Sequence, residues 1–249
     1  MVNYLQHIPS MKALAALTLS IGRFHSSSAF SAYRALRVAP LGGNHFQNGF
    51  SLSSSTTTVI MSMSSSAKRV LVPIADDSEE IETTCITDTL TRFGAEVVVA
   101  SVKSGGELLC KMSRGVKIMA DISIDEATGQ EWDLVALPGG MPGAEHLRDS
   151  AALISILEKQ HAAGKAYAAI CASPAIVLAS KGLLGEGATC YPAPGLTQLM
   201  SSPVANDVVV QGNVITSKGP GTSLKFAIAL GEHLYGPDKA KVIADQMLL

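Results

Sequence analysis

The stretch Lys165-Ala-Tyr-Ala-Ala-Ile-Cys-Ala-Ser-Pro174 decides the fold class of this chain. Its apolar first half predicts a buried strand over residues 165–170, and Pro174 begins a predicted helix over 174–180. Cys171 stands between the two, with small residues on both sides. This pattern is typical of a nucleophile elbow, a tight turn that holds one side chain at the edge of a sheet. A buried structural cysteine is the alternative that these residues leave open.

The same alternation of strand and helix continues through residues 68–249. Apolar runs and turn residues predict strands at 69–74, 96–102, 133–137 and 165–170, hairpins within 108–121 and 208–217, and helices from Asp77 to Phe93 and over 151–162, 174–180, 222–234 and 238–248. We expect Asp77 to cap the first helix, with Glu80 as its capping-box partner. Strands that alternate with helices predict a mostly parallel sheet covered on both faces, and ligands bind such sheets at the carboxyl ends of the strands.

Composition excludes several classes of function. The chain has 249 residues and a formal net charge of −2, so it is long enough for one large domain and lacks the basic charge typical of nucleic-acid binding. Its 4 cysteines form no CxxC pair, which argues against a zinc site or a disulfide framework. No dinucleotide or phosphate-loop motif follows the first strand, and no apolar run is long enough to span a bilayer. We therefore expect no metal, cofactor, nucleic-acid or membrane partner.

Residues 1–67 differ sharply from the rest of the chain. They contain no Asp or Glu and 14 serines, and an apolar stretch from Ala13 to Ile21 follows Lys12. The junction Ala29-Phe30 then resembles that of a bipartite plastid presequence, with a mitochondrial presequence second and a disordered tail without a targeting role third. We expect 1–67 to be a disordered targeting extension and 68–249 to be the folded domain. Translation from Met61 or Met63 would instead leave a cytoplasmic protein.

Three candidate motifs follow predicted strands. Besides Cys171, they are Glu82 in the acidic run 76–82 and the glycine turn Pro138-Gly-Gly-Met-Pro-Gly143. A carboxyl group beside a thiol can act as a general acid and base, and consecutive N–H groups in a glycine turn can bind an anion. Taken alone, the acidic run is explained by the preference for acidic residues in the first turn of a helix. The glycine motif alone is explained by an ordinary turn. Their coincidence at the carboxyl ends of three strands favours an active site.

With these motifs the chain resembles the ThiJ/PfpI superfamily, in the branch of Parkinson disease protein 7. The resemblance covers residues 68–249 and rests on five motifs in order: Ala75-Asp-Asp-Ser-Glu-Glu-Ile-Glu82, Ser113-Arg-Gly-Val-Lys117, Leu137-Pro-Gly-Gly140, Ala168-Ala-Ile-Cys-Ala-Ser-Pro174 and Thr216-Ser-Lys-Gly-Pro-Gly-Thr222. It implies a flavodoxin-like α/β sandwich that forms a homodimer.

The resemblance also implies roles for individual residues. Cys171 would be a reactive, oxidation-prone nucleophile, Glu82 the acid bonded to it, and Gly140 and Ala172 the donors of backbone N–H groups to an oxyanion. The implied pocket residues are Gly139, Tyr191, Pro192, Gly219 and Pro220. One departure is that Tyr191 stands before Pro192 where animal members carry a histidine, so this chain offers a hydroxyl or only a pocket wall there.

The favoured function is a cofactor-independent glyoxalase that converts methylglyoxal or glyoxal to a hydroxy acid, with protein deglycase activity on glycated amines and thiols as a possible extension. We expect the Cys171 thiolate to act beside a protonated Glu82 as one coupled pair. Peptidase and amidotransferase activities are not expected, because Ala172 rather than histidine follows Cys171 and no suitably spaced His-x-Glu comes after it. The alternatives are a redox-sensing chaperone whose Cys171 oxidises to sulfinate and a dimeric binding module with an inert cysteine.

Overall fold

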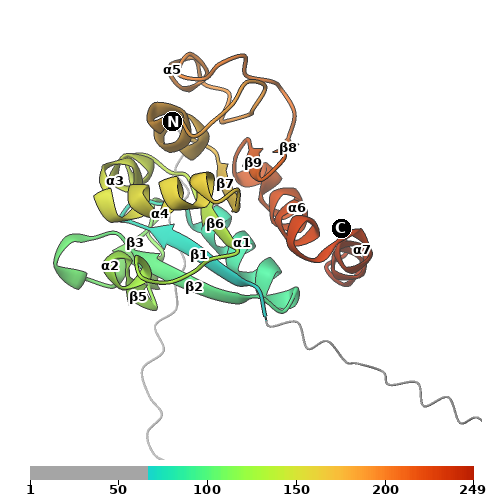
Figure 1. The fold of residues 1–249 in the computed structure, drawn as a ribbon, viewed down its shortest axis with the longest axis horizontal. Helices are drawn as coiled ribbons and strands as arrows, with labels where there is room; N and C mark the ends of the chain where they lie inside the picture. Colours follow the sequence, from blue (N-terminus) through green and yellow to red (C-terminus); the bar gives the residue numbers. More distant parts are fainter. Residues whose placement is uncertain (1–66) are drawn as a thin grey trace, which may run out of the picture. The chain divides into compact units, whose positions relative to one another are not determined.

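A computed structural model describes residues 67–249, which belong to one compact unit. The expectations for the targeting segment 1–67 therefore lie outside the described residues, Ala67 excepted. Figure 1 shows the described part as a central sheet with helices on both sides.

The sheet has seven strands in the order β5-β2-β1-β6-β7-β9-β8. These strands are β1 (Arg69–Ile74), β2 (Glu96–Ser101), β5 (Ile122–Ser123), β6 (Leu134–Leu137), β7 (Ala166–Ile170), β8 (Val208–Gln211) and β9 (Val214–Ser217). All neighbours pair in parallel except β8 with β9, which form an antiparallel hairpin. A second, separate hairpin pairs β3 (Leu109–Lys111) with β4 (Lys117–Met119). The prediction of a mostly parallel α/β sandwich is thereby confirmed.

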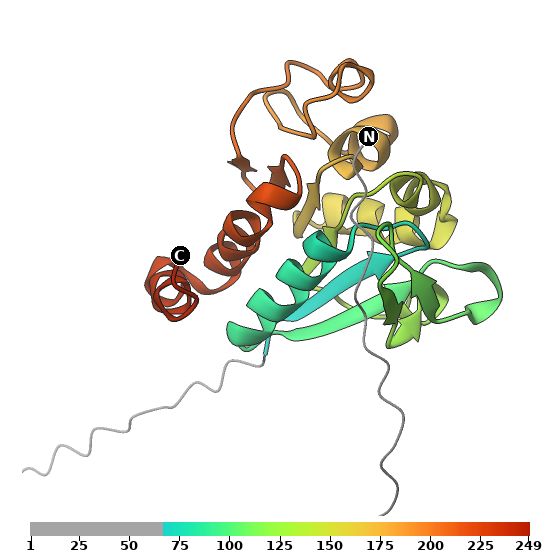
Figure 2. The ribbon, with the colours of Figure 1, turned by 180° about the vertical axis from the view of Figure 1, so that it is seen from behind.

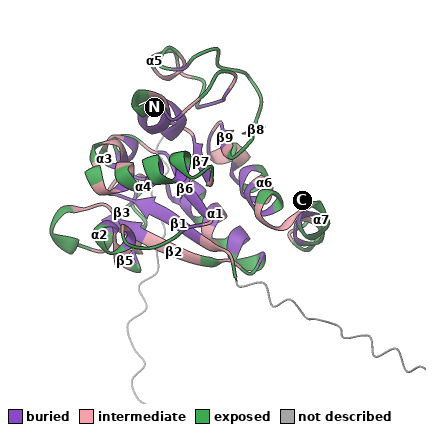
Figure 3. Ribbon diagram, viewed as in Figure 1, coloured by how far each residue is buried: buried purple, intermediate pink, exposed green. Residues whose placement is uncertain are grey.

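Helices cover both faces because the central strands are apolar on both sides. Along β1, Val70 and Val72 pack in a cluster of buried apolar side chains with residues of α1 (Glu80–Arg92) and α6 (Ser223–Tyr235). Leu71 points to the other face of the sheet and packs in a second apolar cluster with residues of α2 (Ile124–Ala127) and α4 (Ala151–Ala162). Figure 1 shows α4 in front of the sheet, and Figure 2 shows α1 from behind. The central strands β1, β6 and β7 are buried while the outer side of α4 is exposed (Figure 3).

The remaining elements connect these layers or extend them. They are η1 (Ser104–Gly106), α3 (Gly143–Asp149), η2 (Pro174–Leu178), η3 (Ala179–Lys181), α5 (Pro194–Thr197), η4 (Pro220–Thr222) and α7 (Pro237–Gln246). The short elements η1, α2, α3 and α5 were absent from the sequence prediction. Three of them are about one turn long and α3 has 7 residues, about two turns, so all are too short for an apolar period to show.

Two local predictions were wrong. The first helix begins at Glu80 with Glu79 as its cap, whereas Asp77 has a φ of 63° and donates its N–H to Lys111 O. That contact with the β3–β4 hairpin holds Asp77 outside the helix. Glu80 does not form a capping box, because its carboxylate accepts hydrogen bonds from Ser113 and Arg114. The predicted helix 174–180 is a π-helical turn over Pro174–Leu178 followed by a 3-10 turn, so it does not continue as a regular α-helix.

Candidate active site

Cys171 follows β7 directly and adopts a φ of 66°, a backbone conformation that non-glycine residues rarely take. Two hydrogen bonds hold this conformation: the Cys171 N–H donates to Ser217 O at 3.0 Å, and the Tyr191 N–H donates to Cys171 O at 2.8 Å. Ser173, two residues on, donates its hydroxyl to Pro138 O at 2.6 Å. The side chain is thus raised at the carboxyl end of the sheet, as an elbow requires.

Glu82 reaches the same end of the sheet from the first turn of α1. Its N–H donates to the capping carboxylate of Glu79 at 2.8 Å, which anchors the turn. Its side chain is fully buried, and Oε2 accepts the Gly139 N–H at 2.6 Å. The other oxygen, Oε1, has no hydrogen-bond partner among the described residues. A buried carboxyl oxygen without a protein donor is available to carry or accept a proton.

The carboxyl and thiol groups lie close enough to change each other's pKa. Burial raises the pKa of Glu82 to about 7, the negative charge of Glu79 adds to the rise, and the Gly139 N–H opposes it. Burial also raises the pKa of the Cys171 thiol to about 12, together with the charge of Glu82. Backbone N–H groups of Gly140 and Ala172 act on the sulfur in the opposite direction. These shifts favour a neutral thiol at Cys171, whereas the sequence analysis expects a thiolate beside a protonated Glu82. The pair titrates as one unit, and the Glu82 carboxyl group lies beside the thiol as an acceptor for its proton.

The glycine turn after β6 allows this close approach. A Cβ added at Gly139 would lie 2.6 Å from Cys171 Cβ and 3.0 Å from Glu82 Oε2. Gly140 has a φ of 93°, and a Cβ there would lie 2.3 Å from Asp77 O. Only glycine fits at both positions, because any side chain would push the turn away from the thiol and from the start of α1.

A cleft of about 310 Å³ opens over Cys171. It is lined by Glu79, Ser113, Arg114, Gly140, Met141, Cys171, Ala172, Tyr191, Leu196 and Pro220. Gly219 lies against the wall, since a Cβ added to it would be 3.3 Å from the Tyr191 ring and 3.9 Å from Cys171 Sγ. The structure therefore brings together the expected residues, with one exception. Pro192 lines a neighbouring cleft with Cys190 and Lys218, because the chain turns away after Tyr191.

Sequence reasoning missed five lining residues as members of the site: Glu79, Ser113, Arg114, Met141 and Leu196. Four of them stand inside motifs that the sequence analysis quoted, so their motif membership was an available signal. Leu196 stands in α5, and no pattern in the sequence marks it.

Glu80 fixes one rim of the cleft. Its buried carboxylate accepts hydrogen bonds from the Ser113 hydroxyl at 2.9 Å and from the Arg114 N–H at 2.8 Å. Burial would raise the pKa of Glu80, but these hydrogen bonds, with a longer one from the Val116 N–H, outweigh it and lower that pKa. The ionised carboxylate therefore holds the 113–116 turn in place.

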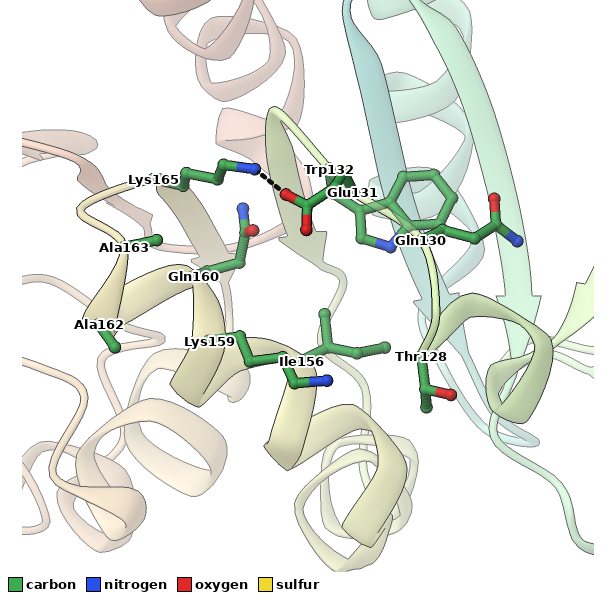
Figure 4. A pocket seen from close by; sticks show the side chains of 10 residues that line it. All are labelled: Thr128, Gln130, Glu131, Trp132, Ile156, Lys159, Gln160, Ala162, Ala163 and Lys165. Atoms are coloured by element: carbon green, nitrogen blue, oxygen red, sulfur yellow. Dashed lines mark hydrogen bonds and ion pairs between the residues drawn. The ribbon is translucent and has the colours of Figure 1, made fainter.

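A second hollow, at the amino ends of β6 and β7, carries none of the three motifs (Figure 4). Trp132 and Ile156 line it, and Lys165 pairs with Glu131 at its edge. Among residues 67–249, no group of three or more His, Cys, Asp and Glu side chains is placed to hold a metal ion. No helix in this part of the chain is both long and apolar enough to cross a membrane.

Comparison with known proteins decides the family. The model of the DJ-1/PfpI family matches residues 68–233, about two thirds of the chain. The chain belongs to the DJ-1/PfpI family. The resemblance inferred from its five motifs is thereby confirmed, and the family match spans every element that builds the cleft.

Curated relatives and solved structures agree with this assignment. Protein DJ-1 homolog B of Arabidopsis thaliana is 46% identical over 73% of this chain, and the match spans only 41% of that protein. Glutathione-independent glyoxalase DJR-1.2 of Caenorhabditis elegans is 33% identical over 72% of this chain and 95% of its own. The solved structure "Toxoplasma gondii DJ-1, oxidized" is 49% identical, with a TM-score of 0.70 over 73% of this chain and 98% of its own.

Proposed function

We propose that this protein is a cofactor-independent glyoxalase of the DJ-1/PfpI family, with Cys171 as nucleophile and Glu82 as acid and base. The observation that carries the proposal is the juxtaposition of a thiol on an elbow, a buried carboxyl group with a raised pKa, and two inward backbone N–H groups. A relative named as a glutathione-independent glyoxalase supports the same reaction.

The reaction begins with transfer of the thiol proton to Glu82. The sulfur then forms a bond to the aldehyde carbon of methylglyoxal, and the carbonyl electron pair moves to its oxygen, giving a hemithioacetal. The N–H groups of Gly140 and Ala172 stabilise the oxyanion until it takes the proton from Glu82.

Isomerisation and hydrolysis complete the cycle. Glu82 removes the proton from the former aldehyde carbon and returns a proton to the neighbouring carbon, so the first carbon is oxidised and the second is reduced. The product is a thioester of a 2-hydroxy acid. Water cleaves the carbon–sulfur bond, releases lactate and restores the thiol. Attack of the same thiol on glycated amines or thiols would give the protein deglycase activity.

The test uses the full chain with Cys171→Ser and, as a matched control, Cys85→Ser, which changes another half-buried cysteine outside the cleft. Methylglyoxal loss and lactate formation are followed without glutathione or metal, in a buffer free of amines. We expect lactate from the parent and from Cys85→Ser, and none from Cys171→Ser. Absence of lactate from the parent would overturn the glyoxalase proposal.

A second candidate function uses the same thiol as a redox sensor or stress chaperone. The Toxoplasma gondii DJ-1 structure is that of an oxidised protein, and in this chain N–H groups and a carboxyl group surround the sulfur. One molecule of hydrogen peroxide would convert the thiolate to a sulfenate with release of water, and a second would give a sulfinate that protonated Glu82 can hydrogen-bond. Graded peroxide followed by intact mass should then stop at two added oxygen atoms on Cys171. Further oxidation, or none, would count against this role.

We also propose a homodimer and organellar import. Ile81, Val116 and Met119 are large apolar side chains, each at least half exposed, on α1 and the β3–β4 hairpin. A second copy of the chain would cover them.

For residues 1–67 we propose plastid targeting, with the mitochondrion second. A fluorescent fusion of that segment that stays cytoplasmic would refute import.

A further inference from the structure

Apolar and polar side chains both line the cleft over Cys171. Met141 and Tyr191 are about half exposed, at 49% and 46%, and both line this cleft. Met141, Tyr191, Leu196 and Pro220 are the apolar lining residues, called the apolar side below, and the polar ones are Glu79, Ser113 and Arg114. Apolar side chains that stay exposed and converge on a reactive group are typical of a binding site for an apolar part of a ligand.

The Tyr191 ring is fixed close to the sulfur. It packs over Gly219, where an added Cβ would lie 3.3 Å from ring atom Cδ2 and 3.9 Å from Cys171 Sγ. Its N–H is bonded to Cys171 O, so the tyrosine backbone moves with the elbow. An aldehyde carbon bonded to Sγ therefore has an aromatic wall beside its substituent.

Two of the four apolar lining residues come from a loop outside the sheet. Tyr191 and Leu196 belong to the long excursion between η3 and β8, which carries α5 and lies over one end of the domain (Figure 1). Leu196 packs beside the buried cluster of Ala144, Ala172 and Ile176, so its position is set by the elbow region. Both side chains are thus tied to the site through separate contacts.

The size of the cleft points in the same direction. Its volume of about 310 Å³ is at the lower end of the range of roughly 300–1,000 Å³ that holds whole small-molecule ligands. Methylglyoxal would fill a small part of it and leave the apolar side in contact with water. A substituent several carbons long would cover that side.

We propose that the preferred substrates are 2-oxoaldehydes with an extended apolar substituent, the dicarbonyl group lying at Cys171 and the substituent against Tyr191, Leu196 and Met141. This inference rests on the proposed glyoxalase function and names its substrate class. Each methylene group that is fully buried is worth about fourfold in binding, so a half-open cleft that takes up several gives an advantage of about tenfold or more.

The experiment compares kcat/KM for 2-oxoheptanal and methylglyoxal with the full chain. We expect 2-oxoheptanal to be favoured by about tenfold or more, and Leu196→Gln to reduce that ratio several-fold. Leu199→Gln is the matched control, because Leu199 follows α5, is 52% exposed and does not line the cleft. Tyr191→Gln is a second variant, at a half-exposed ring that also lines the cleft, and should lower the ratio as well. A ratio near one in the parent, or an equal fall in both leucine variants, would overturn the proposal.

A second measurement does not depend on turnover. Heptanal and propanal each add reversibly to a thiol and would protect Cys171 from iodoacetamide, followed by intact mass. Protection by heptanal at about tenfold lower concentration supports the apolar subsite even where no hydroxy acid forms, in which case only the glyoxalase proposal fails. Equal protection by the two aldehydes would overturn the subsite while leaving methylglyoxal turnover, if observed, in place.

Discussion

The backbone N–H of Gly139 donates a hydrogen bond of 2.6 Å to Glu82 Oε2, and this contact fixes a buried carboxyl group beside the Cys171 thiol. The bond joins the turn after β6 to the first turn of α1. It occupies one carboxyl oxygen and leaves the other, Oε1, without a hydrogen-bond partner among the described residues. The acid–base role proposed for Glu82 depends on this division of its two oxygens.

Glu82→Gln should keep the thiol but lose the proton transfer. The amide oxygen can still accept the Gly139 N–H, so the fold is retained, whereas an amide cannot shuttle a proton. We expect lactate formation to fall by about 10²–10⁴-fold while iodoacetamide still labels Cys171. Glu158→Gln, on the exposed side of α4, is the control and should turn over at the parental rate. Parental turnover by Glu82→Gln would exclude Glu82 as the acid and base.

The raised pKa of Glu82 predicts a pH-dependent stability. In the unfolded chain the carboxyl group ionises near its ordinary value of 4.5, but in the folded protein only near 7. The folded state therefore holds a proton between these pH values that the unfolded state releases, so stability from this group falls as pH rises through the window. Replacing Glu82 by Gln should remove this loss.

The comparison is best made in a Cys171→Ser background, which removes the coupled thiol. Chemical unfolding at pH 5 and pH 8 should show the added Glu82→Gln substitution becoming more stabilising with pH, by up to about 3 kcal/mol. A stability difference that is the same at both pH values would show that Glu82 ionises normally.

Gly139→Ala should disrupt the site through a single methyl group. The new Cβ would lie 2.6 Å from Cys171 Cβ and 3.0 Å from the Ala172 nitrogen, so the elbow or the turn must shift. We expect destabilisation of about 1–3 kcal/mol and loss of most activity, measured by denaturant unfolding and lactate formation. Gly129→Ala is the matched control, because its Cβ would meet nothing within 4 Å. Full activity in Gly139→Ala would mean that the close approach is not needed.

Glu80→Ala should loosen the rim that carries Arg114. The Ser113 hydroxyl and the Arg114 N–H would lose their acceptor, at a cost of about 1–3 kcal/mol. Faster tryptic cleavage after Arg114 would report the change, with Glu232→Ala, an exposed site on α6, as control. Because the pKa of Glu80 is lowered, its stabilisation is complete above pH 4.5 and is lost as pH falls through the lower folded-state value. An unchanged cleavage rate would refute the anchoring role.

Val116→Glu should separate the proposed homodimer. The side chain is 50% exposed beside the Glu80 anchor, so a carboxylate there would be buried against the partner. Light scattering should show a dimer for the parent and a monomer for the variant. Val242→Glu changes an equally exposed valine on α7 and should remain dimeric. A monomeric parent would rule out the proposal directly.

The sequence predicted the architecture better than the local detail around the site. The apolar runs of β1, β6 and β7 indicate buried parallel strands because both faces of each are covered, and that pattern is visible without a structure. The sequence predicts Asp77 as the cap because Glu80 stands three residues on, as in a capping box, but the contact of Asp77 with Lys111 leaves Glu79 as the cap. Tertiary contacts decided between local alternatives of similar energy.

The site shows the same limit. Cys171 and the glycine turn have sequence patterns because elbows and close approaches need small residues. The direction of Glu82 has no pattern, since an acidic residue in a first helical turn usually serves the helix dipole. The place of Leu196 in the cleft could not be predicted for a different reason. Leu196 belongs to a short turn in the long loop between η3 and β8, and whether it lines the cleft depends on where that loop lies.

The backbone at Cys171 is held by Ser217 of β9 and by Tyr191, both of which follow it in the chain. The elbow therefore needs both the loop that carries Tyr191 and β9, which comes last in the chain among the strands of the sheet. A chain that is nascent, truncated before β9 or unfolded for passage through a translocation pore carries Cys171 as an ordinary cysteine. The left-handed backbone at Cys171, and with it the contact between its thiol and Glu82, therefore exists only in the folded domain.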